Sequence, residues 1–331
     1  MLNRALRRDR ARTRASQPGD SPLCSTVRRR FTLFPLSVRI AANFRNPRFR
    51  ARLSSLQAVG TGLIRSLRMS SVRLTQFTDP HLYGNESGEL RGVATLPALE
   101  ATLAHAQRHG WPPDAVLVTG DLVQDDASGY RHFRRVFGSL GLPVLCLPGN
   151  HDEPEAMRRE LGRAPFLLGG VVDLGLWRIV LLDSCIPGAA EGRLSAASLA
   201  ALEAALAAAP SRHALVCLHH HPVAMSSRWL DRVGLANADE FLETIGRHSN
   251  VRGVVWGHVH QSHDTLRRGV RLLATPSTCA QFLPRAEQFA LDRRPPGYRT
   301  LELKADGSIV TEVVWLANGA AGSAAPGWAA A

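Results

Sequence analysis

The sequence lacks a long apolar segment and any extreme of composition. No uncharged apolar run approaches the ~20 residues that a helix needs to cross a bilayer, so we expect neither a membrane-spanning helix nor a membrane partner. Hydrophobic residues make up 45% and charged residues 21% of the 331, as in globular proteins, which excludes a collagen-like, coiled-coil or wholly disordered chain. The length suits one large domain or two ordinary ones.

Acidic residues are nearly absent from the first 68 positions. This segment holds 16 arginines, no lysine and only two acids, Asp9 and Asp20, for a net charge of +14. The remaining 263 residues carry 24 basic and 26 acidic side chains, a net charge of −2. The formal charge of +12 therefore belongs to the amino-terminal segment, and the nearly neutral body offers no general basic surface for nucleic acid.

Residues 1–68 also lack a steady period of apolar residues. Their Arg-, Ser- and Ala-rich composition suits a presequence or a basic nucleic-acid-binding arm. The Arg-Arg-Arg-Phe stretch at 28–31 weakly resembles a twin-arginine export signal, but Pro35 and Arg39 interrupt the apolar run behind it. We favour a disordered extension, or a start assigned too far upstream, because Met69 directly precedes the first strand-like run.

Cysteine pairs with the spacing of a zinc site are absent. The five cysteines are odd in number and widely spaced, and three lie in or beside apolar runs. We expect buried reduced thiols, which favour a reducing compartment and a cytoplasmic location. The five are Cys24, Cys146, Cys185, Cys217 and Cys279.

From residue 70 onward, apolar strand-like runs alternate with amphipathic helical segments. The expected helices cover 94–107, 130–137, 195–209 and 238–248, with another beginning near Pro154, and the expected strands cover 72–77, 115–118, 143–147, 178–182, 214–218 and 251–256. Residues 265–274 and 298–316 favour strands joined by Gly and Asp turns. This order predicts an α/β domain over 69–316 whose sheets are covered by helices, followed by a flexible Ala/Gly-rich tail at 317–331.

Five short polar segments each follow a predicted strand. Loops at the carboxyl ends of strands converge on one edge in α/β folds, so five such segments can meet in space. Each alone is a weak signal, since a lone His usually makes a structural hydrogen bond and Gly-Asn suits an ordinary turn. Their joint occurrence at successive strand ends is hard to obtain by chance. The segments are Thr78-Asp79-Pro80-His81, Gly120-Asp121-Leu122, Gly149-Asn150-His151-Asp152, His219-His220-His221-Pro222 and Gly257-His258-Val259-His260.

Asp, Asn and His without Cys form a ligand set for divalent Mn, Fe, Co or Zn. More of these side chains are present than one ion needs, which indicates a pair of metals. Asp79 and Asp121 contribute −2 against +4 from two divalent ions, and the surplus of +2 suits one metal-bound hydroxide and one singly charged phosphodiester. Two ions ~3.5–4 Å apart lower the pKa of a bound water and stabilise both the attacking and the leaving oxygen.

These segments, within about residues 72–316, resemble the calcineurin-like binuclear metallophosphoesterases. Within that superfamily the similarity is greatest to the bacterial class III 3′,5′-cyclic AMP phosphodiesterases, and it includes the stretches 218–222, 272–279 and 296–303. The resemblance implies a four-layer α/β/β/α sandwich with two mixed β-sheets flanked by helices. It also implies hydrolysis of 3′,5′-cyclic AMP to 5′-AMP, with two divalent ions, iron or manganese, as cofactors and a cyclic nucleotide as the small-molecule partner.

The resemblance assigns a role to each matching residue. Asp79, His81 and His260 would bind the first metal, Asp121 would bridge both metals, and Asn150, His219 and His258 would complete the second site. His151 would be the catalytic residue, as general acid or hydrogen-bond donor to the leaving 3′ oxygen, while a metal-bound hydroxide attacks phosphorus in line. Contacts to the cyclic AMP substrate are expected from His81, Asp121, Asn150, His151, His258 and His260.

One departure from the superfamily is informative. In its protein serine/threonine phosphatase branch, an Asp three residues after the bridging Asp orients the catalytic His, and an Arg follows. Here Gln124 stands at that position, with Asp125 and Asp126 next, and the Arg is missing. This difference argues against a protein phosphatase and leaves open which group orients His151. Asp152 is one candidate, although it can equally cap the helix that begins near residue 154.

His220 and His221, which follow His219 in a run of three histidines, have two interpretations. Alternation along an extended chain would point His219 and His221 one way and His220 the other. His220 and His221 can then be groups near the substrate or simply packed side chains, and the spacing does not decide between these.

The segment 275–281 follows the last metal-binding segment by one hairpin, so we place it near the substrate. Thr275, Ser277 and Thr278 can donate to phosphate or ribose oxygens, or can belong to a turn fixed by Pro276. Of the isolated tryptophans, Trp256 is expected in the core, and the position of Trp229 is left open.

The sequence supports three hypotheses about function. The first is a metal-dependent phosphodiesterase that hydrolyses 3′,5′-cyclic AMP. The second is a hydrolase of other phosphodiesters, such as glycerophosphodiesters or nucleotide-linked lipids, because the same metals serve cyclic and open diesters. The third, of another class, is a nucleic-acid-binding protein that acts through residues 1–68.

Overall fold

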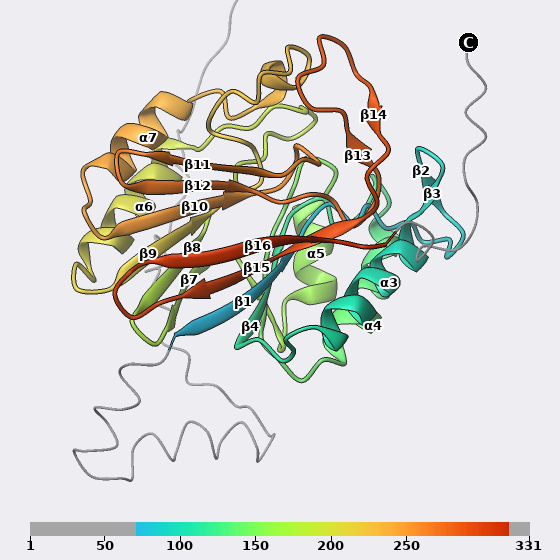
Figure 1. The fold of residues 1–331 in the computed structure, drawn as a ribbon, viewed down its shortest axis with the longest axis horizontal. Helices are drawn as coiled ribbons and strands as arrows, with labels where there is room; N and C mark the ends of the chain where they lie inside the picture. Colours follow the sequence, from blue (N-terminus) through green and yellow to red (C-terminus); the bar gives the residue numbers. More distant parts are fainter. Residues whose placement is uncertain (1–70, 318–331) are drawn as a thin grey trace, which may run out of the picture. The chain divides into compact units, whose positions relative to one another are not determined.

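The computed structural model describes residues 71–317, in which two six-stranded β-sheets pack face to face and carry helices on their outer faces (Figure 1). The expectations for the basic segment 1–68, for Cys24 and for the tail beyond residue 317 lie outside the described residues.

The first sheet has the order β16-β15-β1-β4-β5-β6. Its central strands are parallel, whereas β15 runs antiparallel to β1, and β16 runs antiparallel to β15. The strands are β1 (Val72–Phe77), β4 (Ala115–Thr119), β5 (Val144–Leu147), β6 (Phe166–Leu168), β15 (Gly297–Leu303) and β16 (Ile309–Trp315).

The second sheet has the order β11-β12-β10-β9-β8-β7. Four parallel strands form its centre, and an antiparallel strand closes each edge. The strands are β7 (Gly170–Leu174), β8 (Trp177–Leu181), β9 (His213–Cys217), β10 (Val251–Trp256), β11 (His263–Arg267) and β12 (Val270–Ala274).

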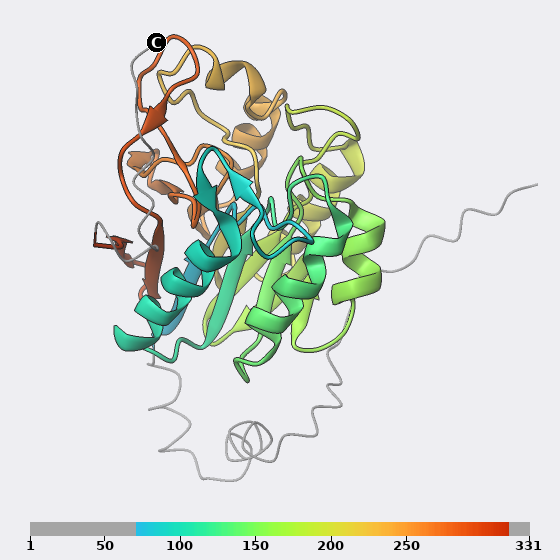
Figure 2. The ribbon, with the colours of Figure 1, turned by 90° about the vertical axis from the view of Figure 1, so that its right-hand side faces the viewer.

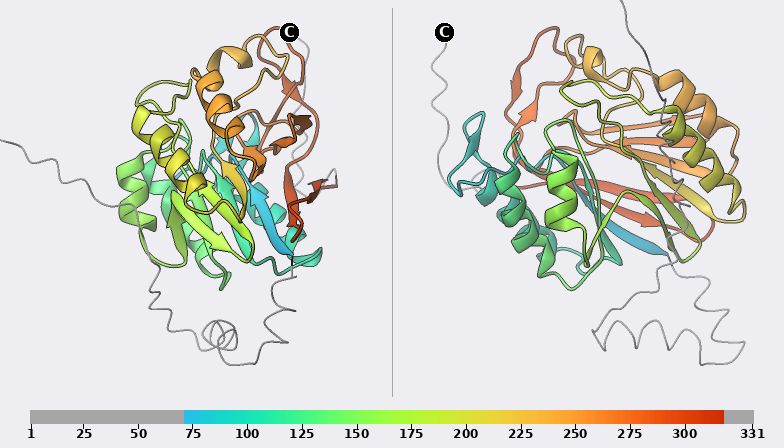
Figure 3. Two further views of the ribbon diagram at one scale, coloured as in Figure 1. Left: turned by 90° about the vertical axis from the view of Figure 1, so that its left-hand side faces the viewer. Right: turned by 180° about the vertical axis from the view of Figure 1, so that it is seen from behind.

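The helices divide between the two sheets (Figures 2 and 3). The helices α3 (Thr95–Arg108), α4 (Tyr130–Gly138) and α5 (Pro154–Leu161) share a hydrophobic cluster with the first sheet. The helices α6 (Ala196–Ala207) and α7 (Ala238–Gly246) share another with the second sheet. Short elements complete the domain: the hairpins β2 (Glu89–Leu90)–β3 (Val93–Ala94) and β13 (Gln281–Phe282)–β14 (Leu291–Asp292), and the 3₁₀ turns η1 (Ala127–Gly129) and η2 (Leu230–Val233).

Strand β4 illustrates why the central strands are largely apolar. Val116 and Val118 pack with the helices of the first sheet, whereas Ala115 and Leu117 belong to the cluster between the two sheets. Successive side chains of a strand point to opposite faces, and here both faces are covered, so every position favours an apolar residue. The aspartates and histidines of the five polar segments stand beyond the ends of these strands.

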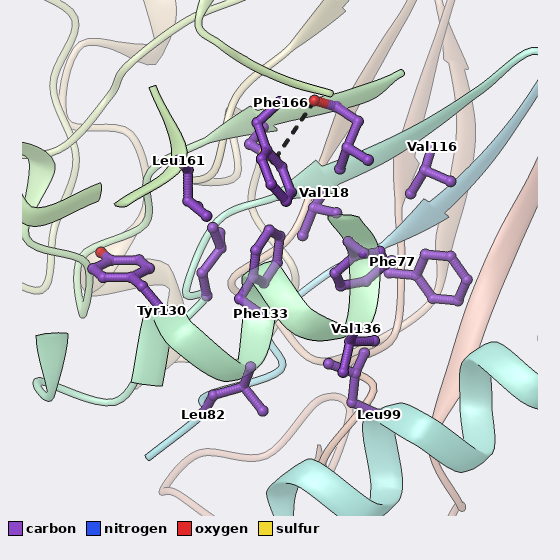
Figure 4. Close-up of a cluster of buried hydrophobic side chains, with 14 of the residues drawn as sticks. Phe77, Leu82, Leu99, Val116, Val118, Tyr130, Phe133, Val136, Leu161 and Phe166 are labelled. Carbon is purple, nitrogen blue, oxygen red and sulfur yellow. Dashed lines mark hydrogen bonds between the residues drawn. The ribbon is translucent and has the colours of Figure 1, made fainter. Parts of the chain in front are cut away.

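Aromatic side chains pack helix α4 against the first sheet (Figure 4). Phe133 of α4 is fully buried, and its ring centroid lies 4.7 Å from that of Phe137 and 5.9 Å from that of Phe166. Phe77, at the end of β1, joins this cluster at 5.7 Å from Phe137. Helix α4 is therefore anchored directly over the strand whose end carries Asp79.

Phe133→Ala is expected to lower the free energy of unfolding by about 3–5 kcal/mol, because it removes a buried ring and leaves a cavity in the close-packed layer. Urea denaturation followed by circular dichroism measures this loss. Leu266→Ala is the matched control, since Leu266 is 73% exposed on β11 and its truncation should change stability by about 0.5 kcal/mol or less. Equal stabilities of the two variants would contradict this assignment of the core.

The structure confirms the four-layer α/β/β/α sandwich and the expected helices and strands, with boundaries that differ by at most two residues. Trp256 is fully buried, as expected. The thiols of Cys146, Cys217 and Cys279 are free and buried, and that of Cys185 is free and half-buried. Between residues 71 and 317, no helix is long and apolar enough to cross a membrane.

Strands β6 and β7 were not among the expected elements. Strand β6 has only three residues, and β7 begins at Gly170 directly after Gly169, both at positive φ. Two consecutive glycines suggest a loop, and β7 buries only Val172 fully, so neither strand has a clear hydrophobic period. Pairing with β5 and β8 stabilises them instead.

Candidate active site

The five polar segments meet at the carboxyl ends of the parallel strands. Strands β1, β4 and β5 of the first sheet and β9 and β10 of the second each end directly before one of them. The two sheets bring their carboxyl ends to one edge of the sandwich, where ligand sites of α/β folds lie. All the residues expected at the site, from Asp79 to His260, are within this group of loops.

One cluster consists of Asp79, His81 and His260, whose ligand atoms lie within 4.8 Å of one another. Nε2 of His260 is 3.5 Å from a carboxylate oxygen of Asp79 and 3.0 Å from Nε2 of His81. On its other side, Nδ1 of His260 donates to the carbonyl oxygen of Ala280 at 2.6 Å. This bond leaves the lone pair of Nε2 facing the cluster, as in metal-binding imidazoles.

A second cluster is built around Asp121. Its carboxylate lies 3.3 Å from Nε2 of His219 and 3.7 Å from Nε2 of His81, so it contacts both sides of the site. Nε2 of His219 is also 3.2 Å from the side-chain oxygen of Asn150. Nδ1 of His219 donates to the carbonyl oxygen of Thr119 at 2.8 Å, which again directs Nε2 inward.

The donor set fits a pair of divalent cations. Asp79 is fully buried and Asp121 is 2% exposed, yet within residues 71–317 their ion pairs are with imidazoles and not with arginine or lysine. Buried carboxylates need a cationic partner, because their desolvation is costly. Nε2 of His258 and Nδ1 of His81 are buried without any hydrogen-bond partner. A cation bound between these groups would pair with the carboxylates and would also accept the free lone pair of His258.

The protonation states favour cation binding. Burial lowers the pKa of His81 to about 4 and that of His258 well below its usual value, so both imidazoles are neutral near pH 7. Burial acts to lower the pKa of His219 too, but Asp121 outweighs it and raises the pKa to about 9. A cation beside Asp121 replaces that proton, since metal ligands bind in their deprotonated form.

Five of the seven candidate ligands have left-handed backbone conformations. Their φ angles are +52° at Asp79, +47° at His81, +49° at Asp121, +66° at His258 and +48° at His260. Non-glycine residues rarely adopt such angles, and strain of this kind gathers at functional sites. The sharp turn at each strand end directs the side chain back over the sheet edge, toward the common centre.

Glycines next to the ligands allow the loops to approach closely. A Cβ on Gly149 would collide with the carboxylate of Asp121, and a Cβ on Gly257 would lie 2.7 Å from a carboxylate oxygen of Asp79. The Gly residues of the Gly-Asn-His-Asp and Gly-His-x-His segments therefore serve packing at the site.

His151 lies at the edge of the site and is oriented by Asp125. Its backbone N–H donates to Asp121 at 2.9 Å, and its ring centroid is 5.3 Å from that of His81. Its Nδ1 is 2.9 Å from a carboxylate oxygen of Asp125, to which Gln124 donates from Nε2 at 2.7 Å. The orienting carboxylate thus stands one residue after the position where the protein phosphatases have theirs, and no spacing rule revealed this.

Asp152 has a different role from either of those considered. Its carboxylate accepts the backbone N–H groups of Leu122 and Gly149, at 3.0 and 2.8 Å, and the hydroxyl of Tyr130 at 2.8 Å. It makes no cap bond to α5, whose N-cap is Glu153. The suggestions that Asp152 caps this helix or orients His151 were wrong, because the carboxylate instead ties the β4 and β5 loops together.

Asp125→Asn is expected to lower kcat for the enzyme's substrate by about 10–100-fold while KM and bound metal stay unchanged. The amide keeps the shape but removes the charge that stabilises protonated His151. Steady-state kinetics and metal analysis measure the two effects. Asp126→Asn is the control, because that neighbouring carboxylate binds Gly84 and Ser128 and not His151, and it should retain near-wild-type kcat. A loss of metal in Asp125→Asn would contradict a purely orienting role.

The triple histidine does not alternate as an extended chain would. The rings of His219, His220 and His221 all surround His258, with centroid distances of 5.0, 4.7 and 5.7 Å. The prediction that His220 points away from the other two was wrong, because β9 ends at Cys217 and the chain turns after it. One ring nitrogen of His220 lies with those of His219 and His258 in a further potential metal-binding group.

The segment 275–278 is hydrogen-bonded to β1 and to the loop that follows it. Thr275, Ser277 and Thr278 are fully buried. The hydroxyl of Ser277 donates to the backbone oxygen of Asp79 at 2.7 Å, and that of Thr275 donates to the side chain of Gln76 at 2.7 Å. Of the two interpretations, the structure supports a packed turn, and these bonds hold the β1 loop in place.

Residues 72–262 match the family model described as calcineurin-like phosphoesterase. This chain belongs to the calcineurin-like phosphoesterase family. It is 42% identical over 245 residues to the 3′,5′-cyclic adenosine monophosphate phosphodiesterase CpdA of Pseudomonas aeruginosa, covering 74% of this chain and 90% of that protein. It is 43% identical over 249 residues to the protein of the same name from Escherichia coli K12, covering 75% of this chain and 90% of that protein.

A solved structure supports the fold alone. A dimetal phosphatase from Danio rerio superposes with a TM-score of 0.53 at 14% identity, covering 72% of this chain and 98% of that one.

Proposed function

We propose that this protein is a phosphodiesterase that hydrolyses 3′,5′-cyclic AMP to 5′-AMP at this site. The observation that carries the proposal is the similarity to relatives named as cyclic AMP phosphodiesterases, at 42–43% identity over 90% of their length. The geometry agrees with this chemistry, because two buried carboxylates and several neutral imidazoles surround one centre with a further histidine at its edge.

The proposed metal ligands are those expected from the sequence. Two divalent ions bound at this site supply charge that stabilises the phosphodiester and lowers the pKa of water. Asp121, which contacts both clusters, would be shared by the two ions. Asp79, His81 and His260 would hold the first ion, and Asn150, His219 and His258 would hold the second; iron and manganese are the proposed metals.

His151 supplies the proton that the reaction needs. Water forms a bond to phosphorus and releases a proton to solvent, the bond from phosphorus to the 3′ oxygen breaks, and the proton on Nε2 of His151 passes to that oxygen. Asp125 stabilises the protonated imidazole through Nδ1, so Nε2 remains a donor toward the site. His81, Asp121, Asn150, His258 and His260 complete the surface that the phosphate contacts.

Free thiols on all four described cysteines fit a reducing compartment, and we place the enzyme in the cytoplasm, where its substrate is a small molecule rather than nucleic acid.

The test uses the full chain, stripped of metal and reloaded with Mn²⁺ or Fe²⁺. Cyclic AMP is supplied beside cyclic GMP, 2′,3′-cyclic AMP and glycerophosphoethanolamine, and the products are identified. Metal-dependent release of 5′-AMP from cyclic AMP supports the proposal. Cleavage of the open diester with cyclic AMP left intact contradicts the substrate, and binding of DNA without any hydrolysis contradicts the reaction.

A further inference from the structure

Three aromatic side chains from different loops form a compact cluster beside the site. Trp229 lies just before η2, Phe282 lies on β13, and Phe289 lies in the loop before β14. Their ring centroids are 5.2 to 5.3 Å apart, and each pair is close to perpendicular, with angles of 71 to 79°. We call these three residues the aromatic wall.

The aromatic wall is joined directly to the candidate metal centre. The ring of Phe282 stacks on that of His260 at a centroid distance of 4.0 Å and an angle of 5°. Phe289 is the next ring along, 5.3 Å from Phe282. Two ring-to-ring contacts therefore lead from a proposed metal ligand to the outer end of the wall.

The outer end of the wall is exposed and carries a positive charge. Phe289 is 41% exposed and the adjoining Leu283 is 42% exposed, so neither is an ordinary core residue. The guanidinium of Arg91, in the turn between β2 and β3, lies 4.8 Å from the centroid of the Phe289 ring. Figure 2 shows this turn and the β13–β14 segment on one side of the domain. Nε1 of Trp229 is buried without a hydrogen-bond partner.

We propose that the aromatic wall binds the purine base of the substrate, with Phe289 and Trp229 as the residues that determine base specificity. The inference rests on the proposed function, because a phosphate held at the metal centre carries its base on the far side of a ribose. A base is flat and aromatic, and it stacks favourably on exposed aromatic side chains. Arg91 adds a cation that interacts with aromatic faces. Core packing alone does not explain an exposed phenylalanine with a cation over its ring.

The test compares cyclic AMP with methyl riboside 3′,5′-cyclic phosphate, which has a methoxy group in place of adenine. Phe289→Ala should raise KM for cyclic AMP by about 5- to 150-fold, the range that loss of one stacking partner produces. Its kinetics with the base-free substrate should match those of the wild type. Phe289→Trp, which retains an aromatic face, should restore most of the affinity.

Adenosine binding, measured by calorimetry, provides a readout that needs no turnover. Adenosine has no phosphate, so its affinity depends on the base and ribose alone. It should bind the wild type and bind Phe289→Ala and Trp229→Ala more weakly. Leu266→Ala is the matched control, because this exposed leucine on β11 lies outside the site, and it should bind like the wild type.

Several outcomes separate this inference from the proposed function. A wild type that cleaves neither cyclic phosphate contradicts the proposed function, while adenosine binding still tests the wall. Unchanged KM and adenosine affinity in folded Phe289→Ala overturn the purine subsite. A second outcome also overturns the purine subsite. If the wild type is a dimer, and Phe289→Ala is a monomer with unchanged KM, the aromatic wall is a contact between two copies of the chain.

Discussion

Asp121→Ala is expected to lower kcat/KM for cyclic AMP by about 10³-fold or more and to remove most of the bound metal. Asp121 contacts histidines of both clusters, His81 at 3.7 Å and His219 at 3.3 Å. Without Asp121, only one carboxylate of the site is left to hold two cations. The cations stabilise the charge of the phosphate by several kcal/mol, so their loss lowers the rate strongly.

Metal content by mass spectrometry and cyclic AMP turnover measure this prediction on the same preparation. Asp121→Asn preserves the shape of the side chain and separates loss of charge from misfolding. Asp173→Asn is the control, because Asp173 is a partly exposed carboxylate that pairs with Arg178 at 2.8 Å, and it should retain metal and activity. Two bound metals and full turnover in Asp121→Ala would remove Asp121 from the proposed site.

His151→Ala is expected to lower kcat for cyclic AMP by about 10²–10⁴-fold without loss of metal. A positioned general acid contributes a factor of this size, and the ribose 3′ oxygen is a poor leaving group unless it is protonated. A ring nitrogen of His151 lies within 4.8 Å of ligand atoms of His81 and Asp121, but its closest carboxylate partner is Asp125 and not a proposed ligand. Its removal should therefore leave both cation sites intact.

A comparison of two leaving groups tests whether His151 acts as the general acid. With a p-nitrophenyl phosphodiester, whose leaving oxygen needs no proton, His151→Ala should lose far less activity than with cyclic AMP. The control is His109→Ala, a histidine at the exposed end of α3. An equal loss with both substrates means that His151 stabilises the phosphate as a hydrogen-bond donor and does not transfer the proton.

The elements and the ligand segments were largely predictable from the sequence. Residues 115–118 are all apolar because both faces of the sheet are covered, and a run of that kind is visible without a structure. The charged and imidazole side chains come directly after such runs, which is why Asp79, Asp121 and His258 could be recognised together.

The errors occurred where the chain leaves regular structure. The three consecutive histidines were treated as an extended chain, but β9 ends at Cys217 and all three rings surround His258. Asp152 was considered as a helix cap, whereas loop backbone groups and Tyr130 surround it. Periodicity carries no information once the backbone turns, so these orientations depend on tertiary contacts.

The sequence by itself determined the helices and strands of an α/β domain, the strand ends that carry the ligands and the types of side chain offered to metal. Those features follow from local periodicity and from the chemistry of Asp, Asn and His. Only the tertiary structure decided that Asp125 orients His151 and that Phe282 stacks on His260. Such contacts join segments far apart in the chain, and their formation depends on how two sheets and their loops pack rather than on any local pattern.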